Sequence, residues 1–187
     1  MEQAINYYIL DEVSSCWDCP YIREIPEELD MINAMLGKKI EAKNLPIRIP
    51  VTITDESEVV YPDIMTADLP LFSNKLKLVF DNLGINNIIY YPVELINEQS
   101  GNTKAHYFLA IILDLIDCLE SGAGRSPAGR FILKNPIIDS TRVKNHRLFR
   151  LGEEPNLIIV DSHIKETIIA ANLTNVLLKK LTDYVSL

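Results

Sequence analysis

Residues 71–88 have the sequence LFSNKLKLVFDNLGINNI, which predicts a capped helix that runs directly into a strand. Ser73 stands at the expected N-cap, where its oxygen can accept a hydrogen bond from an unpaired backbone N–H of the first turn. Leu76 and Phe80 follow on one face of the helix. Gly84 takes the left-handed position that ends many helices, and an apolar residue comes directly after it.

A second segment, 88 residues later, repeats this design. Residues 159–176 have the sequence IVDSHIKETIIAANLTNV, in which Asp161 takes the cap position and Asn172 the left-handed stop. Each helix is expected to lead into an apolar strand, over residues 88–96 and 176–178. Two explanations stay open at this point, a duplicated unit or two helices that share the same capping chemistry. Between the two segments the identical residues are Lys77/Lys165 and Asn87/Asn175.

Shorter patterns predict three elements before these units. Residues 5–10 are aromatic and β-branched, as in a strand. Residues 26–37 predict a helix that opens at a proline, carries two glutamates in its first turn and stops at a glycine. Residues 45–53 alternate between apolar and other side chains, which indicates a strand, and Pro46 and Pro50 place that strand at a sheet edge.

The region after the first unit is expected to be mainly strand. Residues 97–104 predict a hairpin turn, and residues 105–119 a strand to about residue 112 and then a helical turn, because acidic residues recur there at a spacing of three. Residues 121–129 are expected to form a Gly-rich loop. Further strands are predicted over residues 131–138, 147–151 and 157–160.

These elements mix without a regular strand–helix–strand rhythm, which predicts an α+β fold. We expect mixed, mainly antiparallel sheets with a few short helices, two of them in similar strand–cap–helix–strand units. Residues 1–60 are predicted to form an N-terminal acidic α/β segment and residues 61–187 an α+β domain, unless the chain is one compact domain overall.

Composition limits the classes of function. The chain has 187 residues, 48% of them apolar, and a formal net charge of −8. An acidic protein is poorly suited to nucleic acid or an anionic membrane as its main partner. The most apolar run, residues 107–113, is far shorter than the roughly 20 residues of a membrane-spanning helix. With three cysteines and no basic leader before an apolar run, we expect a soluble, cytoplasmic protein.

Cys16 and Cys19 form a C-x-x-C motif, which can bind zinc or exchange a disulfide. A structural zinc site needs a second pair of ligands, and a thioredoxin-like site needs a helix directly after the motif. The sequence offers neither, so we expect two incidental thiols beside a packed Trp17, with no metal and no cofactor.

Two other motifs give only weak evidence of a binding or catalytic site. Residues 121–126 could hold a phosphate with backbone N–H groups, but they lack the lysine of a P-loop, so a mobile loop is the simpler interpretation. Asp114 and Asp117, with His106, could act as acid and base or hold a metal. A solvated stripe of carboxylates explains the two aspartates equally well.

Charge is unevenly distributed along the chain. Residues 1–68 carry 14 acids and 5 bases, whereas residues 125–150 carry seven bases and one acid. An acidic face can steer a basic protein partner towards the chain, although such charge can also serve solubility alone. The basic segment lies among predicted strands and has few interleaved aromatic residues, which argues against nucleic-acid binding. The candidate steering residues are Glu27, Glu28, Asp30, Asp55, Glu56 and Glu58.

A series of short motifs between residues 60 and 178 carries a resemblance to a known family. The motifs are Tyr61-Pro62-Asp63-Ile64, Pro70-Leu71-Phe72-Ser73 with Lys75-Leu76, Ile89-Tyr90-Tyr91-Pro92-Val93-Glu94-Leu95, Tyr107-Phe108-Leu109 through Asp117-Cys118-Leu119-Glu120, Leu148-Phe149-Arg150-Leu151, and Ile158-Ile159-Val160-Asp161-Ser162 leading to Ala171-Asn172-Leu173-Thr174-Asn175-Val176. In this order and spacing they resemble the bacterial immunity-protein domain called domain-of-unknown-function family 1629. Its members accompany polymorphic or contact-delivered toxins.

The resemblance implies a non-enzymatic protein that binds a cognate toxin and blocks it by stoichiometric occlusion. It transfers no catalytic residue, no metal and no cofactor to this chain. The toxin is expected to have a basic surface, and neither nucleic acid nor a membrane is an expected partner. The alternative is a small-molecule-binding or hydrolytic α+β domain that uses Asp114, Asp117 and His106 around a pocket.

Overall fold

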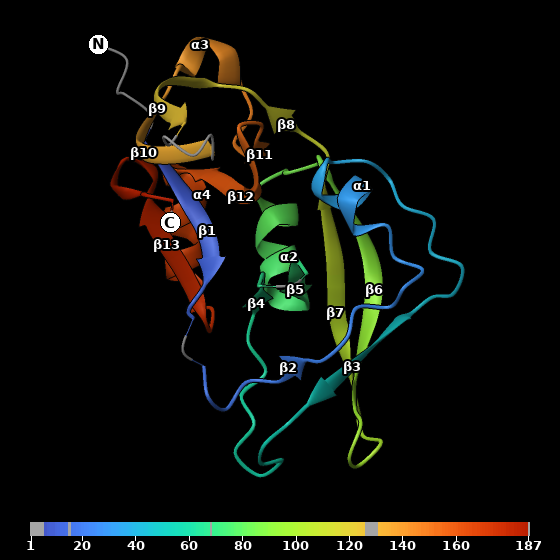
Figure 1. Cartoon of the computed structure of the whole chain (residues 1–187). Coiled ribbons are helices and arrows are strands. Elements are labelled where there is room, and N and C mark those ends of the chain that lie inside the picture. Colours follow the sequence, from blue (N-terminus) through green and yellow to red (C-terminus); the bar gives the residue numbers. More distant parts are fainter. Residues whose placement is uncertain (1–5, 15, 68, 126–130, 187) are drawn as a thin grey trace.

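The structure is a computed structural model of the whole chain (Figure 1), and it describes residues 6–14, 16–67, 69–125 and 131–186. The described strands form three sheets, of six, five and two strands. The six-stranded sheet has the order β2–β3–β6–β7–β5–β4. Its strands are β2 (Tyr21–Ile22), β3 (Ile47–Thr52), β6 (Ile88–Asn97), β7 (Thr103–Ile112), β5 (Leu71–Ser73) and β4 (Ile64–Met65).

The five-stranded sheet has the order β13–β1–β12–β11–β8. Its strands are β13 (Val176–Lys180), β1 (Tyr7–Glu12), β12 (Glu154–Asp161), β11 (Leu148–Leu151) and β8 (Leu115–Ile116). The two-stranded sheet, called the β9–β10 hairpin below, consists of β9 (Leu119–Arg125) and β10 (Phe131–Ile138). The helices are α1 (Met31–Met35), α2 (Asn74–Asn82), α3 (Ser140–Val143), α4 (Ser162–Ala170) and the 3-10 helix η1 (Leu181–Asp183). Described pairings are antiparallel except β3–β6 and β8–β11, which confirms the predicted α+β class.

Alternation along the strands gives each large sheet two apolar faces. On β7, Leu109 and Ile111 join one buried cluster, while Ala110 and Ile112 join another. The middle cluster contains α2 and α4 and touches both sheets, and Figure 1 shows α2 between them. The outer face of the five-stranded sheet is covered by the β9–β10 hairpin, α3 and η1. The chain therefore stacks its elements in layers around three cores.

The capping signals of both units are confirmed. The Ser73 hydroxyl accepts a hydrogen bond from the Leu76 N–H at 3.2 Å, and α2 follows. The Asp161 carboxylate accepts one from the Ile164 N–H at 2.7 Å at the start of α4. The residues after the two helices, a glycine and an asparagine, have φ of 70° and 48°, as the sequence pattern requires.

The first helix starts later than predicted. The Leu29 N–H bonds the Pro26 carbonyl in a separate turn, so Glu27 and Glu28 lie before α1 and not in its first turn. Asp30 is the true N-cap, because its carboxylate accepts the Asn33 N–H at 3.0 Å. The predicted strand over residues 45–53 is confirmed as β3, but the prediction that it lies at a sheet edge was wrong.

Strand β3 lies between β2 and β6. The missing N–H of Pro50 is tolerated there because β2 pairs only with Val51 and Thr52, beyond the proline. Two further predictions were wrong in the region after β7. The expected helical turn contains β8, and most of the expected Gly-rich loop is strand β9, while residues 126–129 of that loop lie outside the described residues.

The two capped segments share a complete topology. Strands β5 and β6, joined by α2, both pair antiparallel with β7, and strands β12 and β13, joined by α4, both pair antiparallel with β1. The register is also the same. Phe108 lies opposite Phe72 and Pro92, and Tyr8 lies opposite Val160 and Lys180, which are those two positions shifted by 88 residues.

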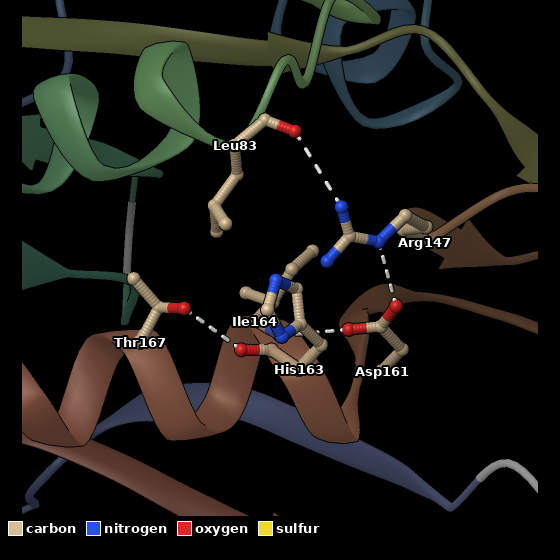
Figure 2. A network of polar contacts seen from close by, with 6 residues as sticks. All are labelled: Leu83, Arg147, Asp161, His163, Ile164 and Thr167. Carbon is tan, nitrogen blue, oxygen red and sulfur yellow. Dashed lines mark hydrogen bonds and ion pairs between the residues drawn. The ribbon is translucent and has the colours of Figure 1, made fainter.

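Each unit also reaches the C-terminal turn of the other unit's helix. Figure 2 shows Arg147, just before β11, placed between the carboxylate of Asp161 and the carbonyl of Leu83 at the end of α2. The Arg147 Nε donates to Asp161 at 2.8 Å, and its Nη1 donates to Leu83 at 3.4 Å. This guanidinium therefore links the cap of α4 to the end of α2.

Asp63 occupies the corresponding position, just before β4. Its carboxylate accepts the Ser73 hydroxyl at 2.5 Å, which links it to the cap of α2. It also accepts the Thr174 N–H at 2.8 Å and the Thr174 hydroxyl at 3.1 Å, beyond the end of α4. Arginine and aspartate thus make equivalent connections between the two units with different chemistry.

The identical asparagines complete this correspondence. The Asn87 side chain donates to the Leu148 carbonyl at 2.7 Å, and the Asn175 side chain donates to the Ile64 carbonyl at 3.4 Å. Leu148 and Ile64 are the first residues of the equivalent strands β11 and β4. Shared capping chemistry alone does not require common register or reciprocal contacts, so the structure supports duplication of one unit.

Candidate functional site: acidic groups around an exposed tryptophan loop

Residues 16–19, which lie between β1 and β2, form a small closed loop. Cys16 and Cys19 are joined by a disulfide, and the Asp18 carbonyl accepts the Val60 N–H at 2.8 Å. Trp17, between the two cysteines, is 87% exposed. The expectation of incidental thiols beside a packed tryptophan was therefore wrong on both points. So short a loop projects its tip towards solvent and leaves the ring outside the described cores.

Other apolar side chains gather around this loop. Tyr21 is 68% exposed on β2, and Val13 and Val60 are also exposed. Val13 and Tyr21 line a cavity of about 250 Å³ together with the disulfide and Met65. We call the four exposed residues the Trp17 patch. It comprises Val13, Trp17, Tyr21 and Val60.

The six predicted acidic residues separate into two groups. Glu27 and Glu28 are exposed beside α1, and Asp30 caps that helix. Asp55, Glu56 and Glu58 lie in the loop that follows β3. Because the same loop continues to Val60, whose N–H bonds Asp18, the second group borders the Trp17 patch. The structure provides no such connection for the group beside α1.

Two acids of the second group also organise the chain locally. The Asp55 carboxylate accepts the Ser57 N–H at 2.8 Å, which closes a turn. Glu56 accepts hydrogen bonds from three side chains at the β6–β7 turn, including Asn102 at 3.0 Å. The other two donors are Asn97 and Ser100.

We expect the β6–β7 turn to loosen in acid because of Glu56. Hydrogen bonds from Ser100, Asn97 and Asn102 lower the pKa of the Glu56 carboxyl. A group whose pKa is lowered by folding stabilises the fold above its unfolded pKa, and this contribution is lost as the pH falls through the folded pKa. The amide chemical shifts of residues 98–102 should therefore change at acidic pH.

The Glu56→Gln variant should show the loosened turn already at neutral pH, because its amide cannot accept all three bonds. Glu58→Gln is the matched control, and it should behave like the wild type. Wild-type shifts that stay constant between about pH 7 and about pH 3 would contradict this role of Glu56.

The residues of the alternative enzymatic hypothesis do not meet. His106 is exposed on β7, whereas Asp114 lies just beyond the end of that strand. Eight residues of extended chain span roughly 26 Å. Asp117 is exposed and lies against Gly152. No one pocket of the described residues can therefore contain this set.

Asp114 instead contacts His146, a histidine whose spacing in the sequence indicates no shared site with it. Its carboxylate lies 2.7 Å from His146 Nδ1 and accepts the Asn87 side chain at 2.6 Å. The pair faces a cavity of about 400 Å³ that Arg147 also lines. A histidine–carboxylate pair can move a proton. However, the described lining of this cavity includes no serine, threonine, cysteine or lysine nucleophile.

Three arginines of the basic segment make structural contacts. Arg150 is buried and donates to the Pro155 carbonyl at 2.7 Å, and burial lowers the pKa of its guanidinium to about 10. Arg142 pairs with Asp139 at 3.2 Å, while Arg147 bridges the two units. Arg130 lies outside the described residues. The bases of this segment that the structure describes are thus not all at the surface, since Arg150 is buried and Arg147 is half-buried.

The described residues contain no group of three or more histidine, cysteine, aspartate or glutamate side chains that could hold a metal ion. The remaining cysteine, Cys118, is buried, and burial raises the pKa of its thiol to about 12. In the part of the chain that the structure describes, no helix is long and apolar enough to cross a membrane.

Comparison with known proteins identifies the family. The model of the Imm11 immunity protein family matches residues 24–183, which include β5–α2–β6 and β12–α4–β13 but not β1. A comparison with curated proteins gave no significant match. The expected immunity-protein character is confirmed at this level, while the assignment to family 1629 stays a prediction. With most of its length matched, this chain belongs to the Imm11 immunity protein family.

Proposed function

We propose that this chain neutralises a cognate bacterial toxin by binding it one to one and covering a surface that the toxin needs. The observation that carries the proposal is the family match, which extends over both repeated units. Membership of an immunity protein family suggests a role without catalysis. Occlusion needs a preformed complementary patch of about 800 Å² on each partner.

The proposed toxin has a basic surface and belongs to a polymorphic toxin system. Glu27, Glu28 and Glu58 are exposed, and their carboxylates make no hydrogen bond or ion pair with residues that the structure describes, so their charge is available to steer a cation-rich partner. Steering acts through long-range attraction, which salt screens. The association rate constant should therefore fall as ionic strength rises.

A cytoplasmic location in the toxin-producing cell completes the proposal. The Cys16–Cys19 disulfide is the feature that counts against this location, because disulfides are typical of oxidising compartments and rare in the cytosol. Cell fractionation, with alkylation of free thiols before lysis, tests the location and the redox state of this pair together.

The decisive test is a titration of toxin activity with the full chain. The probe is the protein encoded by the adjacent open reading frame, provided that it is toxic when expressed alone. Stoichiometric occlusion predicts a linear loss of activity that is complete at one equivalent. Complete inactivation by a small fraction of an equivalent would indicate catalysis, and no inactivation at any ratio would refute the immunity function for this pair.

A further inference from the structure

The Trp17 patch has the composition of an interaction hot spot. Trp17 and Tyr21 keep 87% and 68% of their surface exposed, and Val13 and Val60 extend the apolar area. Tryptophan and tyrosine are enriched among the few residues that carry most of the energy of an interface. Clustered exposed apolar residues with a polar rim commonly mark protein interaction sites, whereas single ones are ordinary.

The patch is also held in place before any partner arrives. The disulfide closes the loop around Trp17, and the Asp18 carbonyl accepts the Val60 N–H at 2.8 Å. On the other side, the Val13 N–H donates to the Asn175 carbonyl at 3.1 Å. A surface fixed at three points loses little conformational freedom on binding, which favours affinity.

The charge around the patch selects the chemistry of the partner. Residues 11–24 carry four acids and one base, and that base, Arg23, lies 3.8 Å from Glu98. Asp18 is next to Trp17 on the loop, and the acidic loop of residues 55–58 runs up to Val60. An acidic border around an apolar centre is complementary to a basic protein surface.

The cavity beside the patch suits one long basic side chain. Glu12 is in its lining, where the carboxylate is positioned by bonds from the Thr66 and Ala67 N–H groups at 3.1 and 3.2 Å. The other walls include Val13 and Tyr21. Lysine and arginine bury an apolar stem and keep a charged end near polar groups, and either can lie over an aromatic ring.

We propose that the Trp17 patch is the anchor through which this chain docks on the basic face of its toxin, with an arginine or lysine of the toxin in the adjacent cavity. This inference rests on the proposed function. The family match begins at residue 24, so Trp17 lies outside it. That position agrees with a recognition element particular to this chain, since discrimination between toxins requires contacts that differ between family members.

The single tryptophan of the chain makes the test direct. The full chain is labelled with 5-fluorotryptophan, which gives one fluorine resonance, and is titrated with the toxin encoded by the adjacent open reading frame. Docking at the patch predicts that this resonance shifts and saturates at one equivalent. A complex whose formation leaves the resonance unmoved overturns the anchor but leaves the immunity function standing.

Two other outcomes would also overturn the anchor. If calorimetry detects no complex with the toxin, both the proposed function and the anchor fail. If the resonance moves with the concentration of this chain alone, the patch binds a second copy of the chain, and the anchor is again overturned.

Affinity measurements with variants provide the second line of the test. Trp17→Ala is expected to weaken binding at least 30-fold, and Tyr21→Ala at least 5-fold. Ile137→Ala, which removes an exposed apolar side chain from β10, is the matched control and should leave the affinity within 2-fold. Thermal unfolding of each variant confirms that it is folded. Equal affinities for Trp17→Ala and Ile137→Ala would overturn the anchor.

Discussion

Replacing Phe80 by alanine is expected to lower the free energy of unfolding by about 3–5 kcal/mol. Phe80 is fully buried on α2, in the apolar cluster that lies between the two large sheets. Its ring lies 5.7 Å from that of Phe72, centroid to centroid, and Ile164 and Ile168 of α4 belong to the same cluster. The truncation would leave a cavity where helix and sheet layers meet.

Leu78→Ala is the matched control for this prediction. Leu78 lies on the same helix but is 47% exposed, and leucine and alanine have similar helix propensity. Its loss should cost less than about 1 kcal/mol. Urea denaturation followed by circular dichroism measures both variants. Equal destabilisation by Phe80→Ala and Leu78→Ala would show that α2 is not packed between the sheets as described.

Asp63→Ala is expected to destabilise the fold by about 3–4 kcal/mol, nearly as much as the loss of the phenylalanine. Asp63 is only 4% exposed, and its carboxylate accepts hydrogen bonds from Ser73 and from both the N–H and the hydroxyl of Thr174. Alanine would leave these donors unsatisfied in a largely buried place. It would also cut a direct link between the two repeated units.

Asp63→Asn separates the hydrogen bonds from the charge. An asparagine oxygen can still accept from Thr174, and its amide can donate to the Ser73 hydroxyl, so its cost should be about half that of alanine. Asp55→Ala, at an exposed turn, should cost less than about 1 kcal/mol. Chemical denaturation of the three variants gives the order. A loss for Asp63→Ala no greater than that for Asp55→Ala would contradict the bridging role.

Local chemistry made the repeated units predictable from sequence. A cap at Ser73 or Asp161 needs only a side-chain oxygen and the N–H three residues later, and the left-handed stop at Gly84 needs only permissive backbone geometry. Both requirements are satisfied within a few residues. Their common register could not be predicted, because it depends on β7 and β1, which come from different parts of the chain.

The errors fall where distant contacts override local patterns. Spacing of three among Asp114, Asp117 and Glu120 suggested a helical face, but the chain there pairs instead with β11 and β10. Two-residue strands such as β8 have too little pattern of their own to be identified. Likewise, Pro26 resembled a helix start, although the cap that the backbone uses is Asp30.

The candidate site was predictable only in its charge. An excess of acids in the first third of the chain can be counted in the sequence, but the division into a group beside α1 and a group beside Trp17 is tertiary. The exposure of Trp17 was missed because a tryptophan side chain is, on average, largely buried. The short C-x-x-C spacing was the available signal, since a bridge over so few residues forms a tight loop.

The position of β1 affects how this protein can fold during its synthesis. β1 is made about 140 residues before the neighbours β12 and β13 between which it lies, which is on the order of ten seconds or more of translation. Until then its apolar residues and both hydrogen-bonding edges have no partner on the ribosome. The contiguous unit from β5 to β7 can fold much earlier. The nascent chain would then carry one folded unit beside an unpaired, aggregation-prone N-terminal strand, to which a chaperone could bind.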